Sequence, residues 1–410
     1  ARLCRRRIIP YQRSDLRMIR PSAKLLTVLS AFTMAVYLST RLNLVASKVQ
    51  LRRASTQFNR VMPNHVHRAT PATPLTKQTA QACRNRREFF RSFVSLAPDQ
   101  LGKSPPLSIW SFNLRSDFNA EKDGEDRWDQ RKRGVVELLH KYNPDVIATQ
   151  ELIAQQVEYL GDNLTGYDYE GCCRLGSDLD EYCAIFFRKD KFEVVEGDTI
   201  WLSETPETPG SIGWDAMYPR IATWTVLKLL DPSEPERLLT VISTHFDHQG
   251  VEARKQSAGL LKGLIEHLQA EFPTSPVMLA GDFNSIKKDN EVYKTLTEGK
   301  NPLQDVWEAA QIKEDNGWKR STMHKFQGKQ FADCMGDGTV ELCSVEDMDK
   351  ELLDVSDGKE HIDWILYINA KEGASKIETL KSSVVTDSLP SGRYPSDHFP
   401  VFAEVAVSTT

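Results

Sequence analysis

Apolar strands that run into acidic, amide or imidazole side chains are the feature of this sequence that most restricts its fold. Five such polar clusters lie beside β-rich runs: Ser111–Arg115, Thr149–Glu151, Ser243–His248, Gly281–Ser285 and Ser396–Pro400. A sixth, His361–Asp363, opens a strand of its own. Charged and polar groups beside buried strands are costly unless they find partners. We therefore expect loops from these strand ends to converge over one sheet edge, where the groups can form a single site.

The β-rich runs alternate with two clear helical patterns. The expected strands are Leu107–Asn113, Val146–Gln150, Cys183–Phe187, Ile221–Leu229, Leu238–His245, Val277–Gly281, Ile362–Ile368 and Pro400–Val407. Apolar residues at three- and four-residue spacing predict helices over Arg127–Tyr142 and Gly250–Phe272, each followed by a proline that ends it. Many strands with helices between them predict an α/β protein in which two sheets pack together with helices outside.

Charge divides the 410 residues into two parts. Residues 1–98 hold 19 basic and two acidic residues, a net charge of +17, whereas residues 99–410 hold 33 basic and 55 acidic residues, a net charge of −22. Such asymmetry predicts that residues 1–98 form a basic leader outside the folded domain of residues 99–410. The overall composition, with 40% hydrophobic and 27% charged residues, excludes a disordered, collagen-like or wholly membrane-embedded chain.

The leader contains a largely apolar run over residues 25–40, bracketed by Lys24 and Arg41. A basic segment before an apolar run is typical of a secretory signal or a single-pass membrane anchor, which is the localisation we favour. An Arg-rich, acid-poor leader is equally typical of mitochondrial or plastid import, and a basic tail is the third alternative. In the first case the leader would contact a membrane. Residues 70–106 contain five prolines and are predicted to be a linker.

Residues 313–360 form an acidic, weakly periodic stretch between the predicted strands of the folded domain. Its composition predicts a surface insertion. The remainder of residues 99–410 supplies the polar clusters, so we expect the chemistry of the protein to lie there.

Carboxylates and carboxamides together are hard oxygen ligands, which suit Mg²⁺ or Mn²⁺ better than a metal that prefers thiolates. Each polar cluster alone is a weak signal, because an Asp after a strand is more often a helix cap or turn residue than a ligand. A His beside one Asp, with another Asp available, can act as an oriented acid or base or as a charged phosphate contact. The combination of clusters therefore predicts metal-assisted acid–base chemistry.

The motifs SFNLR, TQE, STHFDH, GDFN, HIDWI and SDHFPV occur in this order between Leu107 and Val407. In this order they resemble the endonuclease/exonuclease/phosphatase family, and most closely a branch that is grouped with the carbon-catabolite-repressor type of deadenylases. The resemblance implies a four-layered αββα sandwich of two mixed β-sheets flanked by helices. It also implies hydrolysis of a phosphoester with Mg²⁺, or alternatively Mn²⁺, as the cofactor.

The resemblance also implies which residues bind the metal ion at one end of the site, called here the metal end. Glu151 is implied to be the principal Mg²⁺ ligand, and Asn113 to contact the metal or the phosphate. Asp397 is implied to be a further acid at the metal end, and Asp117 a less certain one.

The same resemblance implies the groups that act on the substrate. Asp282 is implied to be the base or aligner of the attacking water, which Asn284 helps to position. His398 contacts the scissile phosphate while Asp363 fixes its ring. His245 and Arg220 are implied to be further phosphate contacts.

The substrate is less constrained by the sequence. A single-stranded RNA hydrolysed from its 3′ end fits the resemblance and the aromatic residues Trp214 and Tyr218, which could stack on bases. A phosphatase or phospholipase C-like hydrolase of inositol phosphates, nucleotides or sphingomyelin-type lipids is the alternative. A net charge of −22 disfavours tight binding to a duplex, since nucleic-acid affinity rises with cationic contacts. A catalytically silent binding module is the third hypothesis, and no obligate protein partner is implied.

Overall fold

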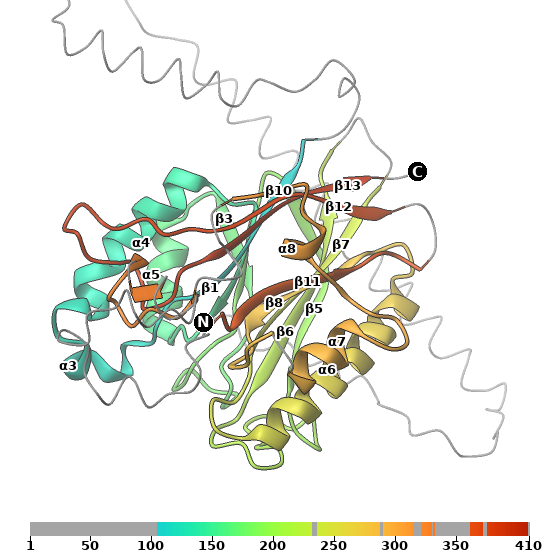
Figure 1. Cartoon of the computed structure of the whole chain (residues 1–410), viewed down its shortest axis with the longest axis horizontal. Helices are drawn as coiled ribbons and strands as arrows, with labels where there is room; N and C mark the ends of the chain where they lie inside the picture. Colours follow the sequence, from blue (N-terminus) through green and yellow to red (C-terminus); the bar gives the residue numbers. More distant parts are fainter. Residues whose placement is uncertain are drawn as a thin grey trace, which may run out of the picture. The chain divides into compact units, whose positions relative to one another are not determined.

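The computed structural model describes residues 105–410 except 232–235, 288–289, 315–320, 330, 333–360, 372–374 and 409–410. In this part of the chain, two β-sheets pack face to face, with helices on their outer faces (Figure 1). The expected α/β sandwich of two mixed sheets is therefore confirmed.

The first sheet has seven strands among the described residues. Their order is β10 (Ile312–Lys313), β12 (Lys376–Val384), β13 (Val401–Ser408), β1 (Leu107–Asn113), β2 (Val146–Gln150), β4 (Ile185–Arg188) and β3 (Tyr167–Glu170). Strand β1 pairs parallel with β2 and antiparallel with β13, so the sheet is mixed.

The second sheet has six strands in the same described part. Their order is β5 (Phe192–Trp201), β6 (Ile221–Leu229), β7 (Leu238–His245), β8 (Val277–Asp282), β11 (Asp363–Ile368) and β9 (Gln304–Asp305). Strands β7 and β8 are parallel, whereas β8 and β11 are antiparallel. Each sheet thus contains one parallel pair near its centre, β1 with β2 and β7 with β8. The carboxyl ends of these strands lie at one end of the sandwich.

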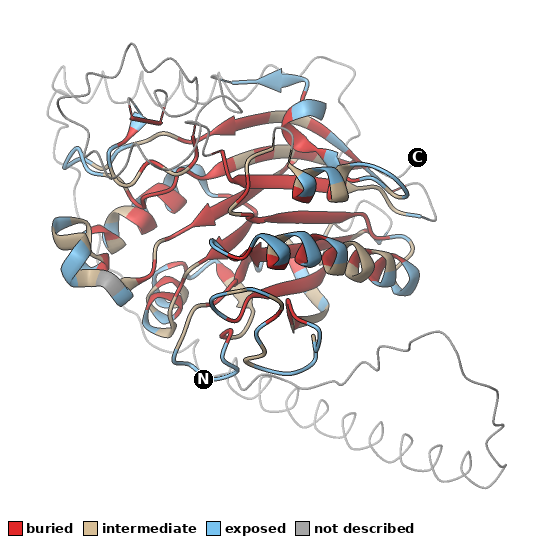
Figure 2. Ribbon diagram, turned by 60° about the horizontal axis from the view of Figure 1, so that its bottom comes forward, coloured by how far each residue is buried: buried red, intermediate tan, exposed pale blue. Residues whose placement is uncertain are grey.

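Helices cover the outer face of each sheet. The longer ones are α4 (Trp128–Tyr142), α5 (Ala154–Asn163), α6 (Val251–Glu271) and α7 (Glu291–Thr297), and the one-turn helices are α3 (Ala120–Asp123) and α8 (Val306–Ala309). Val135 and Leu139 of α4 join Trp110 in one apolar cluster, and α6 residues such as Leu261 join Trp224 in another. Strands are therefore largely buried on both faces, while the helices expose their outer sides (Figure 2).

The period of two along each strand decides which residues reach the space between the sheets. Leu107 and Ile109 of β1 belong to the core between the sheets, as do Met278 and Ala280 of β8. Continuing this alternation puts Asn113 at the end of β1 and Asp282 at the end of β8 on the same inner face. The apolar core therefore gives way to polar groups at one end of the sandwich.

A buried polar contact joins the two sheets just below that end. The Gln150 side chain donates a hydrogen bond from Nε2 to Oγ of Ser243 (3.2 Å), whose hydroxyl donates to the carbonyl of Thr149 (3.0 Å). Strand β7 approaches closely at Gly281, the residue before Asp282. A Cβ at this position would lie 2.3 Å from the carbonyl oxygen of Thr244. The contact of Ser243 with Gln150 and Thr149 fixes the two sheets relative to each other, whereas the close approach of Gly281 to Thr244 lies within the second sheet.

All eight predicted strands are present, with bounds that differ by at most two residues, and both predicted helices are confirmed. The sequence did not predict β3, β5, β12 or α5. The prediction of a surface insertion over residues 313–360 is wrong for Ser321, Thr322 and His324, which are fully buried. Thr322 bonds to the backbone of Asp363 and Phe399, and the backbone N–H of His324 donates to the carbonyl of Asp397 (2.7 Å).

The leader, including the apolar run at residues 25–40, lies outside the described residues, and so does most of the acidic stretch. Among the helices that the structure describes, none combines the length and apolar character needed to cross a membrane.

Candidate active site

Five strands deliver polar residues to the same end of the sandwich. In the first sheet Asn113 lies opposite Gln150, so that Glu151 follows directly beyond the pair. In the second sheet His245 lies opposite Asp282, and Asp282 lies opposite Asp363. Residues that are up to 250 positions apart in the sequence are thereby brought together.

Asn113 connects the two sheets at the site. Its Nδ2 atom donates hydrogen bonds to Oε1 of Glu151 and to Oδ2 of Asp282, each at 3.0 Å. Glu151 has a positive φ of 63°, which turns the chain out of β2, and its other oxygen accepts a hydrogen bond from the backbone N–H of Ser116 (3.2 Å). One amide group therefore fixes both carboxylates.

Glu151 stays ionised in spite of its environment. Burial alone would raise the pKa of its carboxyl group, but the positive charge of Arg115 and the hydrogen bond from Asn113 lower it, with a smaller contribution from His398. The net shift is downward, so Glu151 offers a permanent negative charge at the site.

Asp282 is held at both oxygens. Oδ1 accepts the backbone N–H of Asn284 (2.9 Å), and Oδ2 accepts Asn113 Nδ2. Burial, and after it the charge of Asp363, raises the pKa of Asp282 to about 7. A carboxyl group with this pKa can accept a proton near neutral pH, which is what a general base requires.

His398 and Asp363 form a buried pair beside Asp282. The Nδ1 atom of His398 lies 2.9 Å from Oδ2 of Asp363, and its Nε2 atom lies 4.0 Å from Oδ2 of Asp282. Burial would lower the pKa of His398, but the charge of Asp363 and the hydrogen bond to it raise this pKa well above its usual range. The ring is therefore positively charged at neutral pH.

A segment from the acidic stretch holds this pair in place. Oγ1 of Thr322 accepts hydrogen bonds from the backbone N–H groups of Ile362 (3.1 Å) and Asp363 (3.2 Å). The carbonyl of Thr322 accepts the N–H of Phe399 (2.8 Å), and Met323 forms a β-bridge with His398. Thr322 thus bonds to the backbone on both sides of the His398–Asp363 pair.

His245 is a neutral ring on the other side of Asp282. Burial, and then the charge of Arg220, lowers its pKa well below the usual value. Nδ2 of Asn284 donates to the carbonyl of Phe246 (3.0 Å) and lies 3.1 Å from Nε2 of His245. Since an amide nitrogen only donates, Nε2 of His245 accepts and its proton is on Nδ1, which lies 3.8 Å from Oε2 of Glu181.

Arg220 is nearly buried and has one free donor. Its Nε donates to Oδ2 of Asp247 (3.2 Å), and its Nη2 lies 3.0 Å from Nδ1 of His248. None of the described residues bonds to Nη1, which is buried. Asp247 also accepts the backbone N–H groups of Gln249 and Gly250 (2.9 and 2.7 Å), so Arg220 is anchored with an unsatisfied N–H at the site.

These groups line a pocket of about 580 Å³. Predicted residues on its surface are Glu151, Arg220, His245, Asp282, Asn284, Asp397 and His398. Asn113 and Asp363 lie directly behind them, through the hydrogen bonds given above. The predicted site residues therefore converge, with Asp117 as the exception.

Asp117 does not line the pocket, although its neighbours Ser116 and Phe118 do, and its role as a metal-side acid stays a prediction. Its Oδ1 accepts the backbone N–H of Trp128 at the start of α4 (3.2 Å), and its Oδ2 accepts Nε2 of Gln155 (3.1 Å). The carboxylate is thus used to satisfy an unpaired N–H at a helix start. Asp397 does line the pocket, where Oδ2 lies 3.8 Å from Nε of Arg115.

The sequence missed several groups that also line the pocket: Arg115, Arg174, Asp180, Glu181, His248 and Met323. Arg115 and His248 belong to polar clusters that we recognised, but no role was predicted for them. Asp180 and Glu181 precede a predicted strand, which was a usable signal. Arg174 lies in an irregular loop without any pattern. Of the two aromatic candidates, Tyr218 lines the pocket and Trp214 does not.

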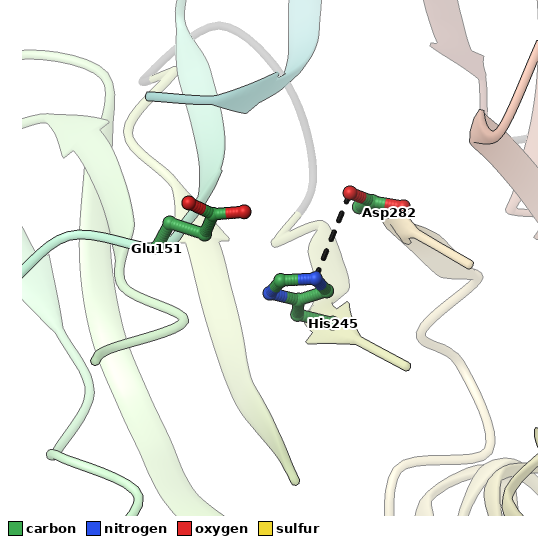
Figure 3. A group of neighbouring side chains, drawn as sticks. All are labelled: Glu151, His245 and Asp282. Atoms are coloured by element: carbon green, nitrogen blue, oxygen red, sulfur yellow. Dashed lines mark ion pairs between the residues drawn. The ribbon is translucent and has the colours of Figure 1, made fainter. Parts of the chain in front are cut away.

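The donor set fits a divalent cation. Glu151, His245 and Asp282 each offer a ligand atom, and these three atoms lie within 4.8 Å of one another. Figure 3 shows the three side chains pointing toward a common space, with Asp282 and His245 3.6 Å apart. Glu151 and Asp282 supply carboxylate oxygens of the kind that hard cations prefer, and His245 adds a ring nitrogen. Asn113 turns its Nδ2 atom toward the two carboxylates, while its Oδ1 accepts the backbone N–H of Arg115 (3.0 Å).

Comparison with known proteins agrees with this geometry. The family model of the endonuclease/exonuclease/phosphatase family matches residues 110–398. Among solved structures, a mannosyl-6-phosphatase of Bacteroides thetaiotaomicron is 31% identical with a TM-score of 0.58, covering 73% of this chain and 99% of the other.

Curated relatives are more distant in sequence. Nocturnin of Rattus norvegicus is 21% identical over 367 residues, which is 83% of this chain and 75% of nocturnin. A probable RNA exonuclease of Schizosaccharomyces pombe is 27% identical over 205 residues, 47% of this chain and 39% of that protein. With the family match spanning most of the described residues, the chain belongs to the endonuclease/exonuclease/phosphatase family of metal-dependent phosphoester hydrolases.

Proposed function

We propose that this protein is a Mg²⁺-dependent phosphatase that hydrolyses a small phosphorylated substrate by in-line attack of water. The observation that carries the proposal is the pocket itself. Its phosphate-binding donors, Arg220 and His398, share about 580 Å³ with the acidic side chains Asp180 and Glu181. A space of this size suits a compact ligand. Carboxylates beside the phosphate groups are unfavourable for a strand that carries further phosphates.

Asp282 is the proposed base. It is oriented by Asn113 and by the N–H of Asn284, so that one carboxylate oxygen can accept a proton from the attacking water. Its pKa of about 7 matches this task near neutral pH. Asn284, held by Phe246 and His245, positions the water from the other side.

His398 and Arg220 are the proposed phosphate contacts. The charged ring of His398 donates from Nε2, because Nδ1 is occupied by Asp363. Arg220 donates from its unpartnered Nη1. Both are fixed before the substrate arrives, so they stabilise the charge that develops on the phosphate oxygens without reorganising. His245, which is neutral, is proposed as a further contact.

Glu151 is the proposed principal ligand of the cation, with Asn113 and Asp397 at the same end of the site. When bound there, Mg²⁺ would neutralise charge on the phosphate and on the leaving oxygen. Mn²⁺ has similar ligand preferences and is the expected substitute.

A 3′-to-5′ exonuclease acting on single-stranded RNA is the second candidate. It is favoured by the likeness to the probable RNA exonuclease of Schizosaccharomyces pombe and by Tyr218, which is 41% exposed at the pocket. An exposed aromatic ring can stack on a base, with a contribution of about 1–3 kcal/mol. The likeness to the mannosyl-6-phosphatase extends over more of this chain, so we place the phosphatase first.

One assay separates the two candidates. Purified full-length protein with Mg²⁺ is given a hexose 6-phosphate, p-nitrophenyl phosphate and a 5′-labelled single-stranded RNA, with a Glu151→Gln variant as the inactive control. We expect phosphate release from the monoesters and little shortening of the RNA. Stepwise 3′ shortening of the RNA without monoester hydrolysis would overturn the phosphatase and support the exonuclease.

A further inference from the structure

The loop between β3 and β4 forms a charged wall on one side of the pocket. Nη1 of Arg174 lies 2.8 Å from Oε2 of Glu181, and Nη2 lies 2.9 Å from Oδ1 of Asp180. One guanidinium group therefore holds two consecutive carboxylates. All three residues line the pocket, although Arg174 itself is only 6% exposed.

The wall is rigidly built. The backbone N–H of Arg174 donates to the carbonyl of Glu181 (2.9 Å), and the indole Nε1 of Trp201 donates to the carbonyl of Arg174 (2.5 Å). The guanidinium carbon of Arg174 lies 5.1 Å from the ring centre of Tyr218, within the range of a cation–π contact. A buried arginine with this many constraints has a fixed orientation, and it fixes the two carboxylates in turn.

The wall adjoins the phosphate-binding groups. Oε2 of Glu181 lies 3.8 Å from Nδ1 of His245, which carries a proton and has no hydrogen-bond partner within the described part of the chain. On the far side of that ring, Nε2 lies 3.6 Å from Asp282. The imidazole ring of His245 therefore separates the proposed base, Asp282, from the wall. A leaving group that extends past this ring would contact the wall with its first atoms.

We propose that Arg174, Asp180 and Glu181 form a subsite for the hydroxyl groups of a phosphorylated polyol, such as a sugar phosphate. This inference rests on the proposed phosphatase function and names the substrate class of that site. Carboxylate oxygens accept hydrogen bonds from hydroxyl groups, and two adjacent carboxylates offer several acceptors in a fixed array. Arg174 orients them, and burial raises the pKa of Glu181 to about 7, so the wall carries at most one net negative charge and no surplus positive charge.

The lack of surplus positive charge on the wall favours a polyol over a nucleic acid. A polynucleotide would bring a second phosphate close to Asp180 and Glu181, where no surplus positive charge attracts it because Arg174 is already paired with both carboxylates. A neutral polyol needs no such charge. A site built to bond hydroxyl groups also discriminates strongly against an analogue without them, because its polar groups are then left unpaired.

The subsite is tested first on the unmodified full-length protein. A hexose 6-phosphate is compared with cyclohexylmethyl phosphate, which has a similar size but no hydroxyl groups. We expect kcat/KM to be at least about tenfold higher for the hexose phosphate. Equal values for the two monoesters would overturn the subsite and leave the phosphatase standing. Hydrolysis of neither monoester, with shortening of RNA, would instead overturn the proposed function.

The same ratio is then measured in variants. Asp180→Asn and Glu181→Gln are expected to lower the ratio of the two kcat/KM values at least about fivefold, because an amide loses acceptor capacity. Glu207→Gln is the charge-matched control, since Glu207 is exposed on the neighbouring loop and does not line the pocket. A ratio that stays constant in both pocket variants, or falls equally in the control, would contradict the assignment.

Discussion

The Nδ1 atom of His398 lies 2.9 Å from Oδ2 of Asp363, and neither side chain is more than 4% exposed. The pair joins the start of β11 to the loop before β13. Without Asp363, burial would favour the neutral ring, which could still donate from Nε2 but without a positive charge. Asp363 therefore sets both the charge and the tautomer of the proposed phosphate contact.

Replacing Asp363 with Asn is expected to lower kcat by about 10²–10⁴-fold, the range that one oriented acid–base group contributes. The amide removes the negative charge that keeps His398 protonated. Steady-state kinetics with a phosphate monoester measure the effect. Circular dichroism of the variant checks that the fold is intact, and a kcat within threefold of the wild type would show that the pair is only structural.

Thr322 is expected to act as a positioning residue for the same pair. Thr322→Val removes the oxygen that accepts the N–H groups of Ile362 and Asp363, leaving two buried donors unpaired. We predict a fall in kcat of about tenfold with KM within twofold, and a fall in the unfolding free energy of about 1–3 kcal/mol.

Thr322→Ser is the matched control, because it keeps the hydroxyl group and loses only a methyl group. Activity in this variant should recover most of the wild-type kcat when both are assayed well below their unfolding temperatures. Equal losses in Ser and Val variants would assign the effect to packing of the methyl group.

Metal binding should distinguish Glu151 from Asp117. Glu151→Gln removes a charge from the donor set and is expected to weaken Mn²⁺ or Mg²⁺ binding at least about tenfold, since affinity follows the number of charged ligands. Asp117→Asn should leave it within twofold, because an amide oxygen can still accept the N–H of Trp128. Titration calorimetry measures both. A comparable loss in the two variants would return Asp117 to the metal site.

Asp247 is expected to make folding stability depend on pH. Burial would raise its pKa, but the N–H groups of Gly250 and Gln249 and the charge of Arg220 lower it to about 2, from an ordinary value of 3.8. A lowered pKa in the folded state adds stability above the unfolded pKa, and this stability disappears as pH falls from about 4 to about 2.

Asp247→Asn should therefore lower the unfolding free energy by about 2 kcal/mol at pH 7, with a gap to wild type that narrows below pH 4. Urea unfolding at pH 7, 4 and 3 measures the gap. The exposed Asp190, paired with Arg188 on the surface, is the control; its Asn variant should change stability by less than about 1 kcal/mol. A gap for Asp247→Asn that does not vary with pH would contradict the assigned cause.

The metal and phosphate groups were predictable because they follow strands directly. When a strand alternates between two faces, the side of its last residue is already set by the apolar residues before it. Leu107 and Ile109 thus place Asn113, and Met278 and Ala280 place Asp282. The alternation of apolar residues along a strand therefore determines on which face its last residue lies. For this reason the positions predicted for Asn113 and Asp282 agree with those in the structure.

Thr322 and Arg174 were not predictable in this way. Thr322 lies in a weakly periodic acidic stretch, and its role comes from partners 40 or more positions away. Arg174 lies in a loop whose conformation depends on Trp201 from another strand. The resemblance implied a metal-side role for Asp117, whereas in the structure its carboxylate accepts the N–H of Trp128 at the start of α4, the more common role for such an Asp.

The hydrogen bonds from Asn113 to Glu151 and to Asp282 have a kinetic consequence. One acceptor belongs to the sheet of β2 and the other to the sheet of β8, with 169 positions between donor and Asp282. A chain in which only one sheet has formed would have only part of the proposed active site in place, and we expect it to be inactive. Regain of activity during refolding should therefore report docking of the two sheets, and lag behind probes of secondary structure alone.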